Sequence, residues 1–325
     1  MSKLHKPPPL PPGTKPLSNQ VAGHKYGDGK MGCLEVDDGT ILKHVQCPPK
    51  GQRELDFYNE VFMGDSTDDI LLELQPLVPT YHGVVHGEKN GSMAKHQFLK
   101  LENLMTKLSK PCIVDIKMGR KTYDPEASPE KVALEIAKFP PVMQLGYQFS
   151  GMLKFDIDKN KMVKYDKYFC KSLTEKSMIV DGLGEFFLQG KHHRKDCIQL
   201  VIDKLKRIEK WFLKQKKYAF YASSLLIVYD ASVHGQGENN DQDILLCSDK
   251  DERSNKLEDI KNDNPSEDAN IDDTSSLSDC GNQSKCYVDV RMIDFTHVFT
   301  SNEEDENYIF GLQNLIKHLE SLMEM

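Results

Sequence analysis

The sequence predicts a two-lobed α+β protein with a cleft between its lobes, and three observations support that prediction. The chain has 325 residues, which is enough for two domains and no more. Its 28% charged and 38% apolar residues are typical of a soluble protein and exclude a membrane protein or a small disulfide scaffold. Strand patterns come first along the chain and mixed helix and strand patterns follow, an order that favours two lobes around a ligand cleft.

The net charge of −8 is distributed unevenly along the chain. Residues 1–116 carry a charge of −1, whereas residues 117–217 have 22 basic and 13 acidic side chains and therefore carry +9. Residues 235–285 carry −9, and residues 286–325 carry −6. The overall sign excludes a nucleic-acid binder that works by bulk positive charge, while the basic middle third predicts a partner rich in phosphate or carboxylate groups.

The cysteines and the apolar stretches bear on the compartment. The eight cysteines form no Cys-x-x-Cys pair and have no regular spacing, so we expect reduced thiols and neither a zinc site nor a disulfide framework. The N-terminal proline run is no secretory signal, and the longest apolar stretch, Leu225–Tyr229, is too short to span a bilayer. We therefore expect a monomer in the nucleus and/or cytoplasm, although His192–Lys195 is a poor nuclear signal that an ordinary solvated loop also explains.

Two segments of biased composition border the folded body. Lys6–Pro16 predicts an extended polyproline arm, so residues 1–19 are expected to be disordered, with a ligand for a proline-reading module as the open alternative. Residues 235–285 are rich in Asp, Asn and Ser and nearly lack aromatic residues, which predicts a disordered acidic insert. The remainder divides into an N-lobe of residues 20–104 and a C-lobe of residues 105–234 and 286–325.

Each element of the folded body follows from a local pattern of apolar residues. The predicted strands are Gly32–Glu35, Thr40–Val45, Phe98–Leu101, Cys112–Lys117, Phe220–Tyr229 and Tyr287–Phe295. The predicted helices are Gln52–Phe62, Cys197–Lys217 and Asn307–Met323. Apolar residues in the longest helix recur at spacings of three and four, and the last two strands are apolar enough to be central in a sheet.

The first candidate site lies in the N-lobe. Lys43 ends an apolar strand, and Glu54 in the following helix can reach back to it. Several kinase folds use such a pair to hold an ammonium group that grips phosphates, although a solvated lysine and an exposed glutamate would give the same pattern. The glycines of His24–Gly32 predict either a loop that covers phosphates or an ordinary hairpin turn. Phe98–Leu104 is typical of a hinge that pairs with an adenine edge, and a plain strand-to-loop transition fits it equally well.

The second candidate site lies in the C-lobe. Asp115 and Lys117 are two residues apart on an apolar strand, so they share one face. Charges on such a strand must pair or hold a ligand, which leaves a structural ion pair as the alternative to a binding site. Asp294 closes another apolar strand, just before Phe295. A carboxylate in that place suits a magnesium ion that bridges nucleotide phosphates, or else simply caps the strand.

Three motifs in this order resemble the signature set of the inositol polyphosphate kinase family: Pro111-x-x-x-Asp115-x-Lys117-x-Gly119, Ser223-Ser224-Leu225-Leu226 and Ile293-Asp294-Phe295. The resemblance covers nearly the whole folded body. Four further segments look most like the multikinase branch of that family: Val21–His24, Pro48–Gly51, Arg53–Tyr58 and Arg291–Phe299. The resemblance implies a protein-kinase-like or ATP-grasp-like fold, with ATP in the cleft and the inositol phosphate in a small insertion at about residues 123–171.

The resemblance also implies roles for individual residues. Lys43 would bind the ATP phosphates, Glu54 would orient Lys43, and Lys117 would face the phosphoryl group that is transferred. The remaining ATP contacts would be Glu102, Asn103 and Leu104 at the adenine, Asp115 at the ribose and Asp294 at Mg²⁺. The inositol contacts would be Lys50, Lys117, Lys131, Lys138, Lys167 and His297. Catalysis is thereby assigned to Lys117, Lys43 and Asp294, and Ser223–Leu226 is interpreted as a structural strand with its apolar pair in the core.

The implied function is that of an ATP-dependent kinase that phosphorylates inositol trisphosphate at its 3- and 6-hydroxyls, towards tetrakis- and pentakisphosphate. A phosphatidylinositol bisphosphate head group is a further candidate substrate. An inositol trisphosphate 3-kinase or an inositol hexakisphosphate kinase is the enzymatic alternative, and a scaffold that acts through the polyproline arm and acidic insert is the non-enzymatic one. The sequence departs from the multikinase pattern at Leu134, Glu135 and Leu153, beside Lys154, which leaves the exact inositol contacts open.

Overall fold

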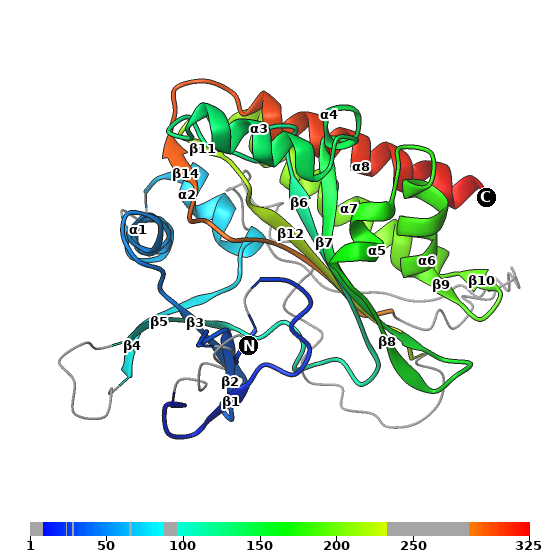
Figure 1. Ribbon diagram of the computed structural model, residues 1–325, viewed down its shortest axis with the longest axis horizontal. Helices are drawn as coiled ribbons and strands as arrows, with labels where there is room; N and C mark the ends of the chain where they lie inside the picture. The colour runs from blue at the N-terminus through cyan, green and yellow to red at the C-terminus, as the bar shows by residue number, and fades with distance from the viewer. Residues whose placement is uncertain (1–8, 24, 28, 65–66, 88–95, 233–285) are drawn as a thin grey trace, which may run out of the picture. The chain divides into compact units, whose positions relative to one another are not determined.

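Two five-stranded antiparallel sheets organise the computed structural model, which describes residues 9–23, 25–27, 29–64, 67–87, 96–232 and 286–325 (Figure 1). The N-lobe sheet has the order β1-β2-β3-β5-β4, with strands Thr14–Pro16, Cys33–Val36, Thr40–His44, His96–Glu102 and Tyr81–Gly87. The C-lobe sheet has the order β13-β12-β6-β7-β8, with strands Val288–Ile293, Ser224–Asp230, Pro111–Met118, Tyr147–Asp156 and Lys161–Tyr165. Two short pairs complete the strands: β9 (Leu188–Gln189) with β10 (His192–His193), and β11 (Tyr218–Phe220) with β14 (Val298–Thr300).

The helices gather mainly on the C-lobe, where α7 and α8 pack on the sheet, and α1 lies beside the N-lobe strands (Figure 1). Their bounds are α1 Lys50–Met63, α2 Asp69–Leu74, α3 Pro129–Lys138, α4 Val142–Leu145, α5 Lys167–Ser172, α6 Glu185–Phe187, α7 Lys195–Lys214 and α8 Glu306–Glu324. A 3₁₀ turn, η1 (Gln75–Leu77), follows α2, and a π-helical segment, η2 (Met178–Gly184), precedes α6. The predicted α+β class is therefore confirmed. Within the described residues, no helix has the length and apolar character to cross a membrane.

The long helix buries the face that its periodicity predicts. Ile198, Val201, Ile202, Leu205, Ile208 and Phe212 of α7 are all buried. Phe212 stacks on Tyr308 of α8, with ring centroids 4.2 Å apart. Burial of large apolar side chains is the main stabilising contribution to such a core, so the α7–α8 layer anchors the face of the C-lobe sheet on which it packs.

Two predicted strands differ from what the structure contains. The expected strand Phe220–Tyr229 is divided, because Ala222 adopts a left-handed backbone with φ of 53° and sends the chain from β11 into β12. The expected central strand Tyr287–Phe295 is instead an edge strand, β13. β13 is apolar because α7 and η1 pack against it, and not because it is central in the sheet. Arg291 of β13 also donates hydrogen bonds to the carbonyls of Pro76 and Val78.

The N-terminal segment is more ordered than the sequence suggests. The prediction of disorder through residue 19 is wrong for Thr14–Pro16, which pair with β2 as an edge strand. An edge position tolerates Pro16, whose missing N–H need not enter the sheet, and Leu10 packs against the cluster around Leu34 and Phe98. Residues 1–8 of the polyproline arm and the predicted acidic insert lie outside the described residues.

One pair of cysteines contradicts the prediction of reduced thiols. Cys197, at the start of α7, and Cys286, just before β13, form a disulfide with a Cα–Cα distance of 6.1 Å. The two are 89 residues apart in sequence, so only the fold brings them together and no spacing rule could have found them. Of the cysteines that the structure describes, the other four are free, namely Cys33, Cys47, Cys112 and Cys170.

The disulfide makes a prediction about stability. A crosslink across so long a segment restricts the unfolded chain, so its reduction is expected to lower the free energy of unfolding by roughly 2–4 kcal/mol. Thermal unfolding followed with and without dithiothreitol should show a lower midpoint under reduction. The Cys197→Ser protein should match the reduced protein and lose its response to reductant, whereas Cys47→Ser should keep the full response. An unchanged midpoint for the wild type under reduction would contradict the crosslink.

Candidate active site

A cavity of about 600 Å³ is lined by residues of both lobes. Eight of the residues singled out from the sequence line it: Lys43, Lys50, Glu102, Leu104, Asp115, Lys117, Asp294 and His297. They come from strands, a helix and loops that are far apart in the chain, which makes this cavity the candidate active site. Glu54 and Asn103 are buried residues outside its lining, and Lys131, Lys138 and Lys167 also lie outside it.

Lys43 is held between two carboxylates. Its Nζ lies 2.7 Å from Oε1 of Glu54, a fully buried residue of α1, and it also forms an ion pair with Asp294. The same Glu54 oxygen accepts a hydrogen bond from the backbone N–H of Phe295 at 3.0 Å. Burial alone would lower the pKa of Lys43, but Asp294 and Glu54 outweigh it and raise that pKa, so the ammonium stays charged. The predicted strand-lysine and helix-glutamate pair is thus present, and the alternative of a solvated lysine is excluded.

Asp294 reaches the cavity through an unusual backbone conformation. Its φ of 65° lies in the left-handed region, which Asp tolerates better than most residues, and the chain turns there directly after β13. Burial would raise the pKa of Asp294, but Lys43 and Lys117 act more strongly and lower it. The cavity therefore contains an ionised carboxylate, as a role in metal binding requires.

Asp115 has a buried carboxyl oxygen that no other group satisfies. The residue is 5% exposed, and its Oδ1 has no hydrogen-bond partner among the described residues. Burial and the nearby charge of Asp294 raise the pKa of Asp115 to about 6, although Ser224, Lys117 and Ser150 act in the opposite direction. An orphaned buried acceptor is costly, so it marks a place where a ligand donor fits.

Lys117 completes this face of β6 without forming the structural ion pair that was the alternative. Within the described chain, no carboxylate lies within salt-bridge distance of its ammonium group, and the side chain lines the cavity. The neighbouring strand contributes differently from the prediction: Leu225 is buried in the core, but Leu226 lines the cavity, and Ser224 hydrogen-bonds to Asp115. Ser223–Leu226 is therefore more than a structural strand.

Part of the cavity wall is apolar. Leu104 and Ile113 pack with Leu153, and Val21 and Met105 pack against this cluster. All but Leu153 also line the cavity, and together they form a slot suited to a flat ring.

The hinge and the glycine loop border this slot. Glu102 accepts hydrogen bonds from the N–H and hydroxyl of Thr80, whereas Asn103 accepts one from the N–H of Met105 and shapes the turn. Gly23, Gly29 and Gly32 line the cavity. Gly27 and Lys30 exchange two backbone hydrogen bonds, so the glycine loop is both a tight turn and part of the wall.

Three of the six predicted inositol contacts, Lys117 among them, line the cavity, and three do not. Lys50 and His297 line the cavity. Lys131 and Lys138 both form ion pairs with Glu135 on α3, so the departure noted at Glu135 has a structural role. The Nζ of Lys167 lies 5.2 Å from the ring centroid of Tyr168. Contact of these three lysines with substrate stays a prediction of the resemblance.

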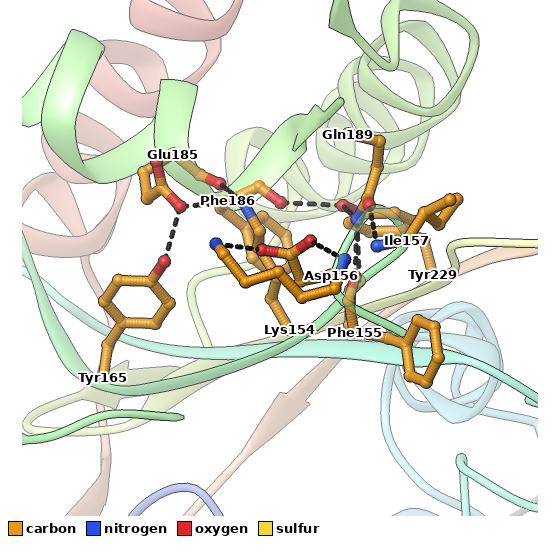
Figure 2. Close-up of polar contacts among 11 residues, drawn as sticks. Lys154, Phe155, Asp156, Ile157, Tyr165, Glu185, Phe186, Gln189 and Tyr229 are labelled. Atoms are coloured by element: carbon orange, nitrogen blue, oxygen red, sulfur yellow. Dashed lines mark hydrogen bonds and ion pairs between the residues drawn. The ribbon is translucent and has the colours of Figure 1, made fainter. Parts of the chain in front are cut away.

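Lys154, the other departure, belongs to a separate polar cluster shown in Figure 2. It is 4% exposed, and its Nζ lies 2.7 Å from Oε1 and 2.8 Å from the backbone oxygen of Glu185. Tyr165 donates a further hydrogen bond to Oε1 of Glu185 at 2.5 Å. Because neighbouring residues on a strand face opposite sides, Leu153 packs beside the cavity wall while Lys154 anchors β7 to α6.

Two residues near the reacting groups were missed by the sequence analysis. Asp124, in the loop between β6 and α3, is hydrogen-bonded to Nδ1 of His297. Cys33, which pairs with Lys43 across β2 and β3, lines the cavity, and burial raises the pKa of its thiol to about 11. A register between strands could have suggested Cys33 once the hairpin was predicted, but no pattern in the sequence links Asp124 to a residue 173 positions away.

The buried Asp115 carboxyl makes a second prediction. In the folded protein its pKa is about 6, above the ordinary value of 3.8. Ionisation of Asp115 therefore destabilises the folded state at pH values above about 6, whereas below about pH 4 the carboxyl is protonated and this cost is absent. Asp115→Asn should therefore stabilise the protein at pH 7.5, by an amount on the order of 2 kcal/mol, and the gain should shrink as the pH falls towards 5. Chemical denaturation of both proteins across this range tests the prediction. A variant that is less stable at pH 7.5 would contradict the stated burial cost.

The site geometry is that of a kinase-like cleft. Lys43 lies between two carboxylates, and Lys117, which has no salt-bridge partner among the described residues, lines the same cavity. A family model described as inositol polyphosphate kinase matches residues 98–320. The chain is 35% identical to the inositol polyphosphate multikinase of Rattus norvegicus, over 98% of this chain and 95% of that protein. It is 34% identical to the Homo sapiens multikinase, over 96% of this chain and 89% of that protein. The chain therefore belongs to the inositol polyphosphate kinase family, as its motifs predicted, and is an inositol phosphate kinase.

Other relatives are similar over a shorter length or in fold alone. Inositol hexakisphosphate kinase 2 of Homo sapiens is 30% identical over 71% of this chain and 52% of that protein. A solved structure of the inositol phosphate multikinase Ipk2 from S. cerevisiae, in complex with ADP and Mn²⁺, matches with a TM-score of 0.55 and 23% identity. That match covers 87% of this chain and 98% of the solved one. It confirms the predicted kinase-like fold.

Proposed function

We propose that the cavity binds ATP with a divalent metal ion and transfers the terminal phosphoryl group to inositol trisphosphate at the 3- and 6-hydroxyls. The observation that carries this proposal is the set of unsatisfied groups in one cavity: the orphaned Oδ1 of Asp115, the unpaired ammonium of Lys117 and the ionised Asp294. Phosphoryl transfer needs mainly alignment and charge neutralisation, and these groups are of the kind that supplies both.

The residues present fit a nucleotide and its metal. The apolar slot around Leu104 and Ile113 accepts a base, and the unsatisfied oxygen of Asp115 accepts a hydrogen bond from a ribose hydroxyl. Lys43, fixed by Glu54, is a cation for the phosphates. Mg²⁺ usually takes one or two carboxylates from a protein, so Asp294 would hold the metal together with phosphate oxygens. The metal, when bound, neutralises charge on the phosphates. The yeast multikinase whose fold this chain shares was solved with ADP and Mn²⁺.

The basic groups of the cavity favour a polyanionic acceptor. Lys50 and Lys117 line it, and within the described chain neither forms a salt bridge, so both ammonium groups are free to contact phosphates. The multikinase relatives match over nearly their whole length, whereas the hexakisphosphate kinase matches over about half of its own. This difference supports a multikinase type of acceptor over that of a hexakisphosphate kinase.

The test is positional analysis of the products. Purified protein with ATP, Mg²⁺ and inositol 1,4,5-trisphosphate should yield a tetrakisphosphate and then a pentakisphosphate, with new phosphates at positions 3 and 6. A product that contains a diphosphate, or a reaction that stops at one tetrakisphosphate, would contradict the proposal and favour one of the alternatives. Vesicles that contain phosphatidylinositol bisphosphate, assayed in parallel, decide whether the lipid head group is also a substrate.

A scaffolding role is a separate proposal, because it rests on composition alone. The arm and the acidic insert of residues 235–285 would recruit partners, and a deletion of 235–285 that loses partner binding but keeps catalysis would support it. Residence in the nucleus and/or cytoplasm and a monomeric state are likewise proposed from the sequence. Cell fractionation and light scattering of the purified protein test them.

A further inference from the structure

We propose that His297 and Asp124 form a catalytic dyad in which Nε2 of His297 accepts the proton of the attacking inositol hydroxyl and Asp124 orients the ring. The sequence resemblance assigned His297 only to substrate contact and gave no residue the task of receiving this proton. The inference rests on the proposed function, since it needs the acceptor hydroxyl to lie in the cavity that His297 lines.

The contact with Asp124 fixes the state of the imidazole ring. Nδ1 of His297 is paired with Oδ2 of Asp124, and a carboxylate can only accept a hydrogen bond, so Nδ1 carries the proton in the neutral ring. Nε2 then bears the lone pair. Among the described residues, no hydrogen bond engages Nε2. The ring is held by one nitrogen and free to act through the other.

The charged groups around the ring keep it neutral in the resting protein. They are Asp124 from the loop before α3 and Lys50 and Arg53 from α1. Burial lowers the pKa of His297, Lys50 and Arg53 lower it further, and Asp124 opposes them without cancelling them, so the net pKa is below the ordinary value. At neutral pH the ring is therefore unprotonated and able to act as a base.

The position of Asp124 is itself supported by a second ion pair. Glu126, two residues later in the same loop, pairs with Arg53, whose guanidinium carbon lies 4.3 Å from the ring centroid of Phe299. Phe299 is in β14, which starts directly after His297. Glu126 thus connects the loop to α1, and Asp124 connects it to the segment before β14. Each of the two contacts can be removed by a separate substitution.

The proton and electron pairs balance in the proposed step. The inositol oxygen forms a bond to the terminal phosphorus of ATP while the bond from that phosphorus to the β-phosphate oxygen breaks and ADP leaves. The hydroxyl proton passes to Nε2, and Asp124 stabilises the resulting imidazolium. The imidazolium then loses its proton to water before the next turnover. A late proton transfer, as expected for a loose transition state, still needs such an acceptor.

The first experiment measures the tautomer and the pKa of the His297 ring directly, without any substrate. In ¹⁵N-histidine NMR spectra of the full chain, His297 should show the Nδ1–H tautomer and a pKa below the ordinary value of 6.5. Asp124→Asn should lower that pKa further, because the carboxylate raises it. An Nε2–H tautomer in the wild type would overturn the proposal regardless of what the protein phosphorylates.

The second experiment measures the turnover of the variants. His297→Ala should lower kcat by roughly 100-fold with little change in the KM for ATP, and added imidazole should restore part of the loss. Asp124→Asn should lower kcat by roughly 10-fold or more and shift the acidic limb of the pH–rate profile to lower pH. Wild-type turnover of inositol trisphosphate must be seen first; its absence would refute the proposed function and not the dyad.

Glu126→Gln is the matched control for loop position. This substitution removes the ion pair with Arg53 and leaves Asp124 and His297 unchanged. The kcat should therefore stay within about threefold of the wild type, and the pH–rate profile should not shift. Equal losses for Glu126→Gln and Asp124→Asn, or His297→Ala activity that imidazole does not restore, would show that these residues only hold the loop and would overturn the proposed base.

Discussion

Asp294→Asn should lower kcat more than any other single substitution in the cavity, by roughly 10³-fold or more, since a bound metal stabilises the transition state by several kcal/mol. The carboxylate pairs with the ammonium of Lys43, and under the proposed function it would also hold the metal. Asparagine tolerates the left-handed backbone found at this position, so the turn after β13 should survive and the protein should fold. The loss would then reflect charge and not a change of shape.

Two measurements separate this reading from a general loss of structure. A titration with Mg²⁺ or Mn²⁺ should require a much higher metal concentration for the residual activity of the variant than for the wild type. Asp203→Asn, which removes an exposed carboxylate from α7, should leave kcat and metal dependence unchanged. A fall of less than tenfold for Asp294→Asn, with unchanged metal dependence, would remove Asp294 from the catalytic groups.

Lys117→Ala should lower the rate of the chemical step by roughly 100- to 1000-fold, the range seen when one preorganised group that faces the developing charge is removed. Lys117 differs from Lys43 in having no carboxylate partner among the described residues, so its charge is available to the phosphoryl group. The ATP dissociation constant should change little, because Lys43 and the apolar slot remain. Single-turnover kinetics at saturating ATP, together with an independent measurement of ATP binding, separate these two effects.

The control for Lys117 is a lysine of the same sheet that lies away from the cavity. Lys161, exposed on the edge strand β8, can be changed to alanine with no expected effect on either quantity. Should Lys117→Ala weaken ATP binding while leaving the single-turnover rate intact, Lys117 would be a nucleotide contact and its assignment to the transferred group would be refuted.

Local patterns in the chain predicted the α+β class, the three long helices α1, α7 and α8, six strand segments, and the candidate residues Lys43, Glu102, Leu104, Asp115, Lys117 and Asp294. Lys50 and His297 came from the resemblance alone. The periodicity of α7 and the motif around Asp115 and Lys117 are properties of neighbouring residues, and each constrains which face a side chain takes. The resemblance to the inositol polyphosphate kinases then connected Lys43, Glu54 and Asp294 across the sequence, and the geometry agrees with that connection.

Apart from the predicted pair of Lys43 and Glu54, only the tertiary structure decided which distant polar groups meet. Glu185 pairs with Lys154, 31 residues away, and Asp124 pairs with His297, 173 residues away. The same holds for the disulfide of Cys197 and Cys286 and for the edge position of β13. Such pairs depend on packing between segments that are distant in the chain, and a local sequence pattern does not predict this packing. The sequence therefore indicates which residues can do the chemistry, and the fold determines which of them are free to do it.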